Sequence, residues 1–209
     1  MSKGYNRIAG IYDGLARIVF GKSMVQSQTI FLDQLQNCKS VLVLGGGTGW
    51  WLNDLLKKYP EIQITFVETS IKMISIAKKG LKFNNRVEFV YGSVESLSAK
   101  KRFDAVVLYY FVDLFDELIL NNVIKEIERR LKPEATWLAT DFIEEKKWHT
   151  VFLKVMYTFF NYTTDLKTKS LPDWRKVLQI NGLRIIEQQS FYLGFILSVA
   201  YRSRKQKMG

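Results

Sequence analysis

A glycine-rich stretch and a later glutamate are the residues best suited to bind a ligand. Residues 45–49 read Gly-Gly-Gly-Thr-Gly, between an apolar run at 40–45 and a helical pattern. Glycines at such a turn let the backbone approach a ligand closely, and the following helix N-terminus favours negative charge. Glu68 ends the next apolar run, where a carboxylate can accept hydrogen bonds from both hydroxyls of a ribose. The alternative for Glu68 is a solvent-exposed residue after a strand.

The spacing of the glycines argues against two common nucleotide sites. In the dinucleotide pattern G-x-G-x-x-G the third glycine would fall at position 50, which is Trp50. A phosphate-binding loop of the Walker type needs Gly-Lys-Ser/Thr after the turn, and that sequence does not follow. The turn therefore favours a nucleoside ligand that is not a dinucleotide.

Alternating apolar runs and amphipathic stretches must position these residues. The predicted strands are 40–45, 63–67, 87–91, 103–109, 135–140, 183–189 and 194–201. The predicted helices are 50–59, 71–79, 118–131, 150–161 and 173–181. Strands that alternate with helices predict an α/β fold, a doubly wound seven-stranded sheet that is mostly parallel. The last two strands are too close in sequence for a crossover helix, so they should form an antiparallel hairpin.

Composition limits the class of protein. The chain has 209 residues, a formal charge of +11, one cysteine (Cys38) and one histidine (His149). An intramolecular disulfide and a thiolate zinc cluster are thus excluded, and no metal site is expected. The charge suggests an anionic neighbour, nucleic acid or membrane, or else simply a basic surface. With no signal-peptide pattern and no long apolar run, the expected location is the cytoplasm.

Four motifs together resemble a known family. They are VLVLGGGTG at 41–49, VETSIKMI at 67–74, YGSVESL at 91–97 and FDAVVLYYFVDLF at 103–115. They resemble class I S-adenosylmethionine-dependent methyltransferases, which have a Rossmann-like sheet with an antiparallel final pair. The N-terminal YNRIAGIYDGLARIVFG is similar to the ubiquinone/menaquinone-biosynthesis C-methyltransferases and their small-molecule relatives. The resemblance implies one methyltransferase domain over 1–209, with a helical cap over about 1–38 and a lid-like helical insertion over about 144–172.

The resemblance also implies S-adenosyl-L-methionine as the cofactor and a set of residues that bind it. That set is Tyr5, Tyr12, Gly45, Gly46, Gly47, Glu68, Thr69, Met73, Gly92, Ser93, Val94 and Tyr109. Two positions depart from the family pattern, which usually has an acid at Val43 and an Asp at Ser93. Ser93 can still hydrogen-bond, but Val43 cannot. Tyr5, Tyr12 or Asp141 would then hold the cofactor's ammonium group.

Candidate catalytic residues follow the fourth and fifth strands, because ligands of open α/β sheets bind at the carboxyl ends of strands. They are Tyr110, Asp113 and His149. His149 has an ordinary pKa near 6.5, which suits a general base, and its alternative is a surface helix residue. Asp113 is either catalytic or the cap of the helix that starts near Glu117. Tyr110, like Tyr109, is as readily explained as pocket lining.

The segment 150–161 is unusually apolar for a surface helix. Its polar residues form one narrow stripe, and Phe159 and Phe160 lie among the apolar ones. The alternatives are a core helix, a lid over an apolar acceptor, a dimer interface and a membrane contact. With the lid interpretation, serine at position 159 or 160 should reduce acceptor binding but leave cofactor affinity unchanged.

These patterns predict an S-adenosylmethionine-dependent methyltransferase of a small, lipophilic acceptor. The alternatives are an RNA or protein methyltransferase that uses the basic surface, and a catalytically weak homologue that acts as a partner subunit. The expected partners are a small-molecule acceptor, peripherally a membrane, and a second copy in a homodimer. Nucleic acid is disfavoured, because the signature [DN]-P-P-[YF] is absent after the fourth strand.

Overall fold

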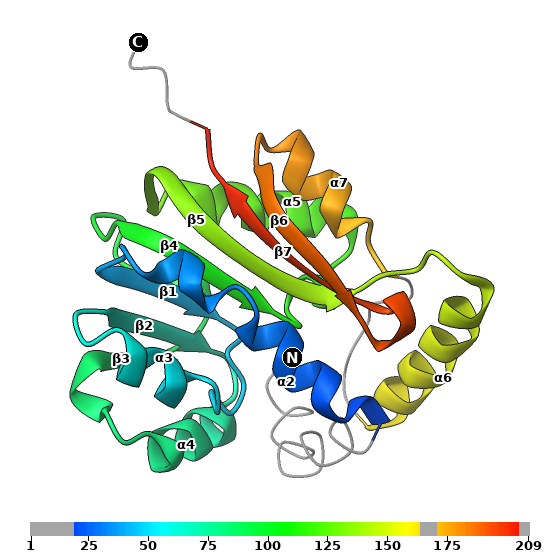
Figure 1. Ribbon diagram of the computed structural model, residues 1–209, viewed down its shortest axis with the longest axis horizontal. Coiled ribbons are helices and arrows are strands. Elements are labelled where there is room, and N and C mark those ends of the chain that lie inside the picture. The colour runs from blue at the N-terminus through cyan, green and yellow to red at the C-terminus, as the bar shows by residue number, and fades with distance from the viewer. Residues whose placement is uncertain (1–18, 164–170, 205–209) are drawn as a thin grey trace.

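Seven strands form one sheet in the order β3-β2-β1-β4-β5-β7-β6 (Figure 1). The computed structural model describes residues 19–163 and 171–204, without the side chains of residues 84, 157 and 159–163. The strands are β1 (Ser40–Leu44), β2 (Gln63–Glu68), β3 (Val87–Tyr91), β4 (Phe103–Tyr109), β5 (Leu131–Phe142), β6 (Arg184–Phe191) and β7 (Ile196–Arg202). β1 to β5 are parallel, and β7 is antiparallel to both β5 and β6. The predicted fold class is confirmed.

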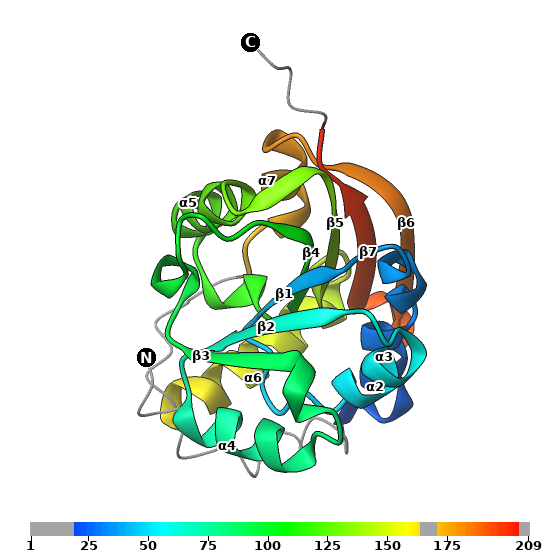
Figure 2. The same cartoon turned by 90° about the vertical axis from the view of Figure 1, so that its left-hand side faces the viewer.

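Helices cover both faces of the sheet. They are α2 (Lys22–Thr29), α3 (Leu52–Lys58), α4 (Ile71–Gly80), α5 (Glu117–Glu128), α6 (Lys147–Thr163) and α7 (Trp174–Ile180), with short 3₁₀ turns η1 (Leu32–Leu35), η2 (Asn84–Arg86), η3 (Val94–Ser96), η4 (Val112–Leu114) and η5 (Tyr192–Gly194). Figure 2 shows α5 and α7 on one side of the sheet and α2 and α3 on the other.

The two faces follow from the alternation of side chains along each strand. Leu42 and Val106 pack with residues of α5 and α7, whereas their neighbours Val41 and Val107 pack with residues of α3 and η1. All four are fully buried. Burying an aliphatic side chain of this size contributes about 1.5–3 kcal/mol, so continuous apolar runs are what a sheet covered on both faces requires.

Two predicted boundaries around Pro133 are wrong. The helix predicted over 118–131 ends at Glu128, and the fifth strand begins at Leu131 rather than at 135. Pro133 lies in an irregular part of the β4–β5 pairing, where the register shifts, and Glu134 beside it has a φ of 57°. Proline lacks an N–H, and at such an irregularity no ladder hydrogen bond is lost.

A separate aromatic cluster lies between α6 and the carboxyl end of β5. It consists of Phe20, Met24, Phe142, Leu153, Phe195 and Ile196, with Trp148, Phe152 and Tyr192 packed against it. α6 contains the predicted helix 150–161 and buries one side in this cluster. Among the helices of the described residues, none has the length and apolarity to cross a membrane.

Candidate functional site

The glycine turn after β1 combines a tightly packed position with an open one. Gly45, Gly47 and Gly49 have φ values of 61°, 57° and 60°, which disfavour other residues. A Cβ at Gly46 would lie 2.2 Å from the ring of Phe66, while a Cβ at Gly47 would meet no atom of the described residues within 4 Å. The Phe66 ring therefore packs closely against the turn at Gly46. At Gly47 a ligand has room to approach the backbone.

The close packing at Gly46 leads to a prediction about stability. Gly46→Ala should lower the unfolding free energy by about 1–3 kcal/mol, because the methyl group overpacks a core that already holds the Phe66 ring. Denaturant unfolding measures this loss. Phe66→Leu removes the ring atoms involved, so the double variant should lose less than the sum of the two single variants. Simple additivity would contradict the prediction.

Glu68 holds the glycine turn from the end of β2. Its Oε2 accepts the N–H of Gly47 at 3.2 Å, and its Oε1 accepts the N–H of Ser70 at 2.9 Å. Burial raises the pKa of Glu68, and the N–H groups of Ser70 and Gly47 offset part of that rise. Glu68 is 8% exposed, so its interpretation as a solvent-exposed residue is wrong.

The loops after β2 and β3 lie next to each other. The N–H of Gly92 donates to the backbone oxygen of Glu68 at 3.1 Å, and β2 and β3 pair up to their last residues. Thr69 is exposed, whereas Met73 and Val94 are buried. The structure thus brings five of the predicted cofactor residues to one edge of the sheet, beside the glycine turn.

Ser93, where the family usually has an acid, donates its hydroxyl to Oε2 of Glu95 at 2.5 Å. The sequence pattern does not reveal a role for Glu95, because its contact with Ser93 arises only in the folded loop. The carboxylate of Glu95 stands two residues from the expected position. Val43 is fully buried in β1 beside Phe66, so it takes no part in binding a polar group.

Tyr109, the last residue of β4, and Tyr110, which follows it, have different surroundings. Tyr109 is buried with its ring edge against Trp51, at 5.1 Å between centroids. Tyr110 has a φ of 52°, an uncommon conformation for a residue with a side chain, and its hydroxyl lies 2.9 Å from Oγ of Ser27. Burial raises the pKa of both phenols far above the usual value, so both stay neutral. The contact of Tyr110 with Ser27 holds α2 against the sheet, and a catalytic role of Tyr110 stays a prediction.

Ser27 of α2 is a junction that the sequence pattern did not reveal. Its Oγ donates to the backbone oxygen of Met24 at 2.9 Å, so the Tyr110 hydroxyl is the donor in their contact. Its backbone oxygen accepts the hydroxyls of Thr140 in β5 at 3.1 Å and of Ser198 in β7 at 2.7 Å. One residue thus joins α2 to two strands, β5 and β7, and to the residue that follows β4.

Asp113 and Asp141 form a pair of neighbouring carboxyl groups: Asp113 is half-buried in η4, which follows β4, and Asp141 is buried near the end of β5. Asp141 is fully buried: its Oδ2 accepts the N–H groups of Val112 at 3.0 Å and Asp113 at 3.2 Å, and its Oδ1 accepts that of Phe142 at 2.8 Å. Among the residues that the structure describes, buried Oδ1 of Asp113 has no hydrogen-bond partner. Three donors favour the charged form of Asp141, which leaves it engaged and poorly placed to hold a ligand's ammonium group.

Burial changes the protonation of this pair. Burial raises the pKa of Asp113 to about 7, and burial together with repulsion from Asp113 raises the pKa of Asp141 well above its usual value. The pair therefore shares a proton at neutral pH, and Asp113, with a pKa of about 7, carries it about half of the time. Asp113 does not cap α5: the cap is Asp116, which accepts the N–H of Ile119 at 2.9 Å.

His149 is not a surface residue. None of its described contacts involves Asp113. It is fully buried at the start of α6, where Nδ1 accepts the N–H of Glu145 at 3.1 Å. Its ring packs edge-on against Trp148 and Phe195, with centroids 4.2 and 5.3 Å away. Burial is the main cause that lowers the pKa of His149, so the ring is neutral at physiological pH. Its surface alternative is wrong, and its catalytic role stays a prediction.

Other predicted residues cannot be placed. Tyr5 and Tyr12 lie outside the described residues, and the side chains of Phe159 and Phe160 do too. No group of three or more His, Cys, Asp or Glu side chains that could hold a metal ion occurs within residues 19–163 and 171–204.

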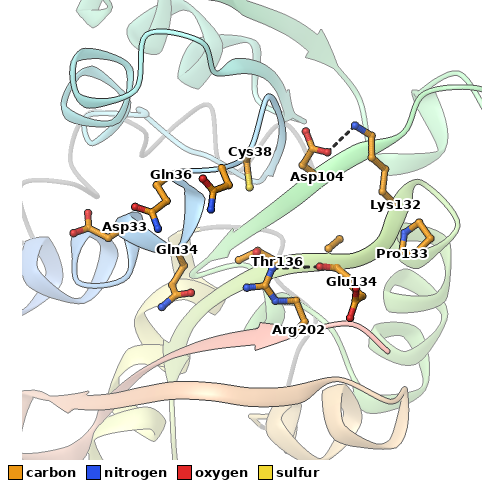
Figure 3. A pocket seen from close by; sticks show the side chains of 12 residues that line it. Asp33, Gln34, Gln36, Cys38, Asp104, Lys132, Pro133, Glu134, Thr136 and Arg202 are labelled. Carbon is orange, nitrogen blue, oxygen red and sulfur yellow. Dashed lines mark hydrogen bonds and ion pairs between the residues drawn. The ribbon is translucent and has the colours of Figure 1, made fainter. Parts of the chain in front are cut away.

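A pocket of about 380 Å³ lies at the opposite end of the sheet, at the amino ends of β1, β4 and β5 (Figure 3). On its wall Asp104 pairs with Lys132 at 2.6 Å, and Arg202 donates to the backbone oxygen of Glu134 at 3.4 Å. Cys38 also lines it, and burial raises the pKa of this thiol to about 11. A neutral thiol is a poor nucleophile, and the glycine turn is at the other edge, so this pocket is separate from the candidate site.

The strand order, the glycine turn and the acid at the end of β2 are those of a Rossmann-like methyltransferase fold. The sequence agrees: residues 41–134 match the family described as a methyltransferase domain. Residues 41–134 therefore belong to a methyltransferase domain, and the predicted resemblance to class I methyltransferases is confirmed over this region.

Relatives extend the similarity beyond the matched region. The chain is 32% identical to a malonyl-[acyl-carrier protein] O-methyltransferase of Priestia megaterium, over 68% of this chain and 51% of that protein. It is 34% identical to a demethylmenaquinone methyltransferase of Thermotoga maritima, over 61% of this chain and 55% of that protein. The chain thus spans about half the length of these curated relatives.

Solved structures share the fold at low sequence identity. A methyltransferase in complex with the Haloferax volcanii Trm112 methyltransferase activator has a TM-score of 0.73 and 14% identity, covering 98% of this chain and 99% of that one. Human N-acetylserotonin methyltransferase in complex with SAM has a TM-score of 0.65 and 17% identity, covering 94% of this chain and 56% of that one.

Proposed function

We propose that this chain binds S-adenosylmethionine at the carboxyl ends of β1 to β3 and transfers the methyl group to a small, apolar acceptor. One observation carries the proposal: the Glu68 carboxylate lies 3.2 Å from the N–H of Gly47, beside the open space at Gly47. A carboxylate and a free backbone approach at one turn are what a nucleoside with a ribose needs. The neighbour that was crystallised with SAM supports the choice of cofactor.

The residues at this edge fit the cofactor except at one position. Glu68 would accept the ribose hydroxyls, and Gly47 would let the backbone come close. Ser93 and Glu95 together would offer a hydrogen-bonded acid on the adenine side. Val43 offers nothing to the ammonium group, so Tyr5 and Tyr12 stay its proposed holders. When bound, S-adenosylmethionine supplies a methyl group on a sulfonium leaving group, so the chain needs only to orient, desolvate and accept a proton.

Asp113 is the proposed proton acceptor. Its unpartnered Oδ1 lies at the end of β4, where a parallel sheet places its substrates. With its pKa raised to about 7, Asp113 is half ionised near neutral pH, which suits a general base. As an O–H acceptor is methylated, its proton would move to Asp113. Asp141 would position Asp113 by holding the backbone of Val112 and Asp113.

An apolar acceptor is favoured by the aromatic cluster. Phe142 ends β5, close to Asp141, and the cluster continues from it to Phe152 of α6. α6 and the insertion over about 144–172 would act as the lid of the site. The relatives named for demethylmenaquinone and for malonyl-[acyl-carrier protein] show that similar chains serve more than one acceptor. A cytoplasmic location, a peripheral membrane contact and a homodimer belong to the same proposal.

Two alternatives have specific support. The charge of +11 favours an RNA or protein acceptor. Val43 offers nothing to the cofactor's ammonium group, and one structural neighbour was solved in complex with a methyltransferase activator. Together these observations favour a weakly catalytic chain that depends on a partner subunit. Phosphate-driven RNA binding would fall steeply with added salt.

Calorimetric titration with S-adenosylhomocysteine and NADH tests the cofactor, and we expect binding of the first alone. Methyl transfer to quinols, malonyl thioesters and RNA then tests the acceptor. Binding of NADH without binding of S-adenosylhomocysteine would overturn the assignment of the cofactor. Methylation of RNA alone would overturn the acceptor class.

A further inference from the structure

The outer face of α6 exposes apolar side chains at helical spacing. Val151 is 64% exposed and Val155 is 63% exposed, one turn apart. Leu193, in the η5 turn between β6 and β7, is 79% exposed. We call these three residues, with Lys147 and Lys154 of α6, the α6 face. Leaving three large aliphatic side chains in water is unfavourable unless the surface has a partner.

The side of α6 opposite the α6 face packs against the body of the protein. On the inner side of the helix, Leu153 is buried, and Trp148 and Phe152 lie 6.4 Å, between ring centroids, from Tyr192 of η5. The ammonium of Lys146 donates to the backbone oxygen of Leu193 at 2.9 Å. Figure 1 shows the η5 turn next to α6. The turn and the outer face of the helix therefore form one continuous surface.

The backbone of η5 projects Leu193 outward at some cost. Tyr192 and Leu193 have φ values of 48° and 56°, in the left-handed region that residues with side chains seldom occupy. The cluster contacts of Tyr192 hold this conformation, and Leu193 gains no burial from it. A strained turn that exposes its apolar residue is consistent with a contact made outside the chain.

Charge distinguishes between possible occupants. The 17 residues of α6 include no acid, and Lys147 and Lys154 are exposed on the same side as the valines. Of the two acids that precede α6, Glu145 is neutralised by Arg175 at 2.7 Å, while Glu144 is exposed. Two α6 faces packed against each other would bring their lysines together, whereas an anionic lipid surface would attract them.

We propose that the α6 face docks on an anionic membrane surface, with Val151, Val155 and Leu193 in the interface and the two lysines at lipid phosphates. Apolar side chains flanked by lysines on one face are the pattern of helices that lie in the bilayer interface. α6 follows directly after the carboxyl end of β5, so docking brings the end of the sheet that holds Asp141 to the lipid. Only this last consequence, delivery of an acceptor from the bilayer, rests on the proposed function.

Vesicle co-sedimentation of the full chain tests the docking without any methyl transfer. Vesicles of phosphatidylcholine and phosphatidylglycerol in equal proportion should bind the protein, and phosphatidylcholine alone should bind it much less. Val151→Asp/Val155→Asp and, separately, Lys147→Gln/Lys154→Gln should each weaken binding about tenfold or more. The matched controls are Leu118→Asp, at a residue 74% exposed on α5, and Lys57→Gln on α3, which should change binding less than about twofold.

Two outcomes would overturn the proposal. One is equal binding of the α6-face variants and the wild type, or binding to neither kind of vesicle. The other is a concentration-dependent dimer in sedimentation equilibrium that the Val151→Asp/Val155→Asp variant loses, which would assign the face to a second copy. Calorimetry with S-adenosylhomocysteine on the same variants shows whether the cofactor site is intact, so failure of docking and failure of the proposed function are distinguished.

Discussion

Replacing Glu68 by alanine should weaken the binding of S-adenosylhomocysteine roughly 10- to 150-fold, the equivalent of about 1.5–3 kcal/mol for hydrogen bonds to a charged group. The same change should also destabilise the free protein. The N–H of the fully buried Ser70 loses its acceptor, which costs about 1–3 kcal/mol, less what is gained by removing a buried charge. Titration calorimetry and urea unfolding measure the two effects.

Matched variants separate the two roles of Glu68. Glu68→Gln keeps one acceptor oxygen but turns an NH₂ group toward a second N–H. Its losses of cofactor affinity and of stability should therefore lie between those of the wild type and of Glu68→Ala. Glu61→Ala removes an exposed carboxylate just before β2 and should change neither quantity. If Glu68→Ala destabilises the protein while cofactor affinity stays within about twofold, then Glu68 is a structural clamp and the ribose binds elsewhere.

Replacing Asp113 by asparagine should stabilise the protein at pH 8 and change little at pH 4. The pKa of Asp113 is about 7 in the folded protein and near 3.8 when unfolded, so the folded state binds the extra proton between these values. Stability from this group is thus present below about pH 4 and is lost as the pH rises to about 7. The full loss is about 4 kcal/mol at most, which Asp113→Asn recovers. Unfolding free energies at several pH values measure it.

Asp141→Asn is the contrasting variant. Asp141 accepts three backbone N–H groups, and an amide offers only one acceptor oxygen, so the protein should lose stability at pH 8. Turnover of the wild type should rise with pH through about 7 as Asp113 ionises, and Asp113→Asn should lack this rise. An unchanged pH profile in Asp113→Asn, with no gain in stability, would sink the assignment of the shared proton and of the base.

The sequence predicts elements well where burial imposes a simple period. The continuous apolar run of β4 was predicted with its observed bounds, because a strand covered on both faces admits few polar residues. The error at Pro133 has a physical reason: proline ends helices and is excluded from regular ladders. The pattern does not reveal that the β4–β5 pairing becomes irregular at that residue.

Residues of the site were harder to predict where their role depends on a distant partner. The sequence indicates a role of Glu68 in cofactor binding but not in stability, since its bonds to Gly47 and Ser70 arise only when the turn folds back on β2. The sequence predicts Asp113 as catalytic or a helix cap, and Asp141 as a holder of the cofactor's ammonium group. Their shared proton follows from the adjacency of β4 and β5, which joins residues 28 apart in sequence. The surface alternative for His149 was wrong because a polar ring can be buried among aromatic ones.

The junction at Ser27 also determines how the N-terminal helix can move. α2 has eight residues, no side-chain cap and no acid in its first turn, so it would hardly persist by itself. Its attachment to Tyr110, Thr140 and Ser198 makes it part of the same cooperative unit as the middle of the sheet. Fraying of α2 would have to break hydrogen bonds to β5 and β7 together. Its amides should therefore exchange with solvent as slowly as those of the central strands, in spite of the helix's position at the surface.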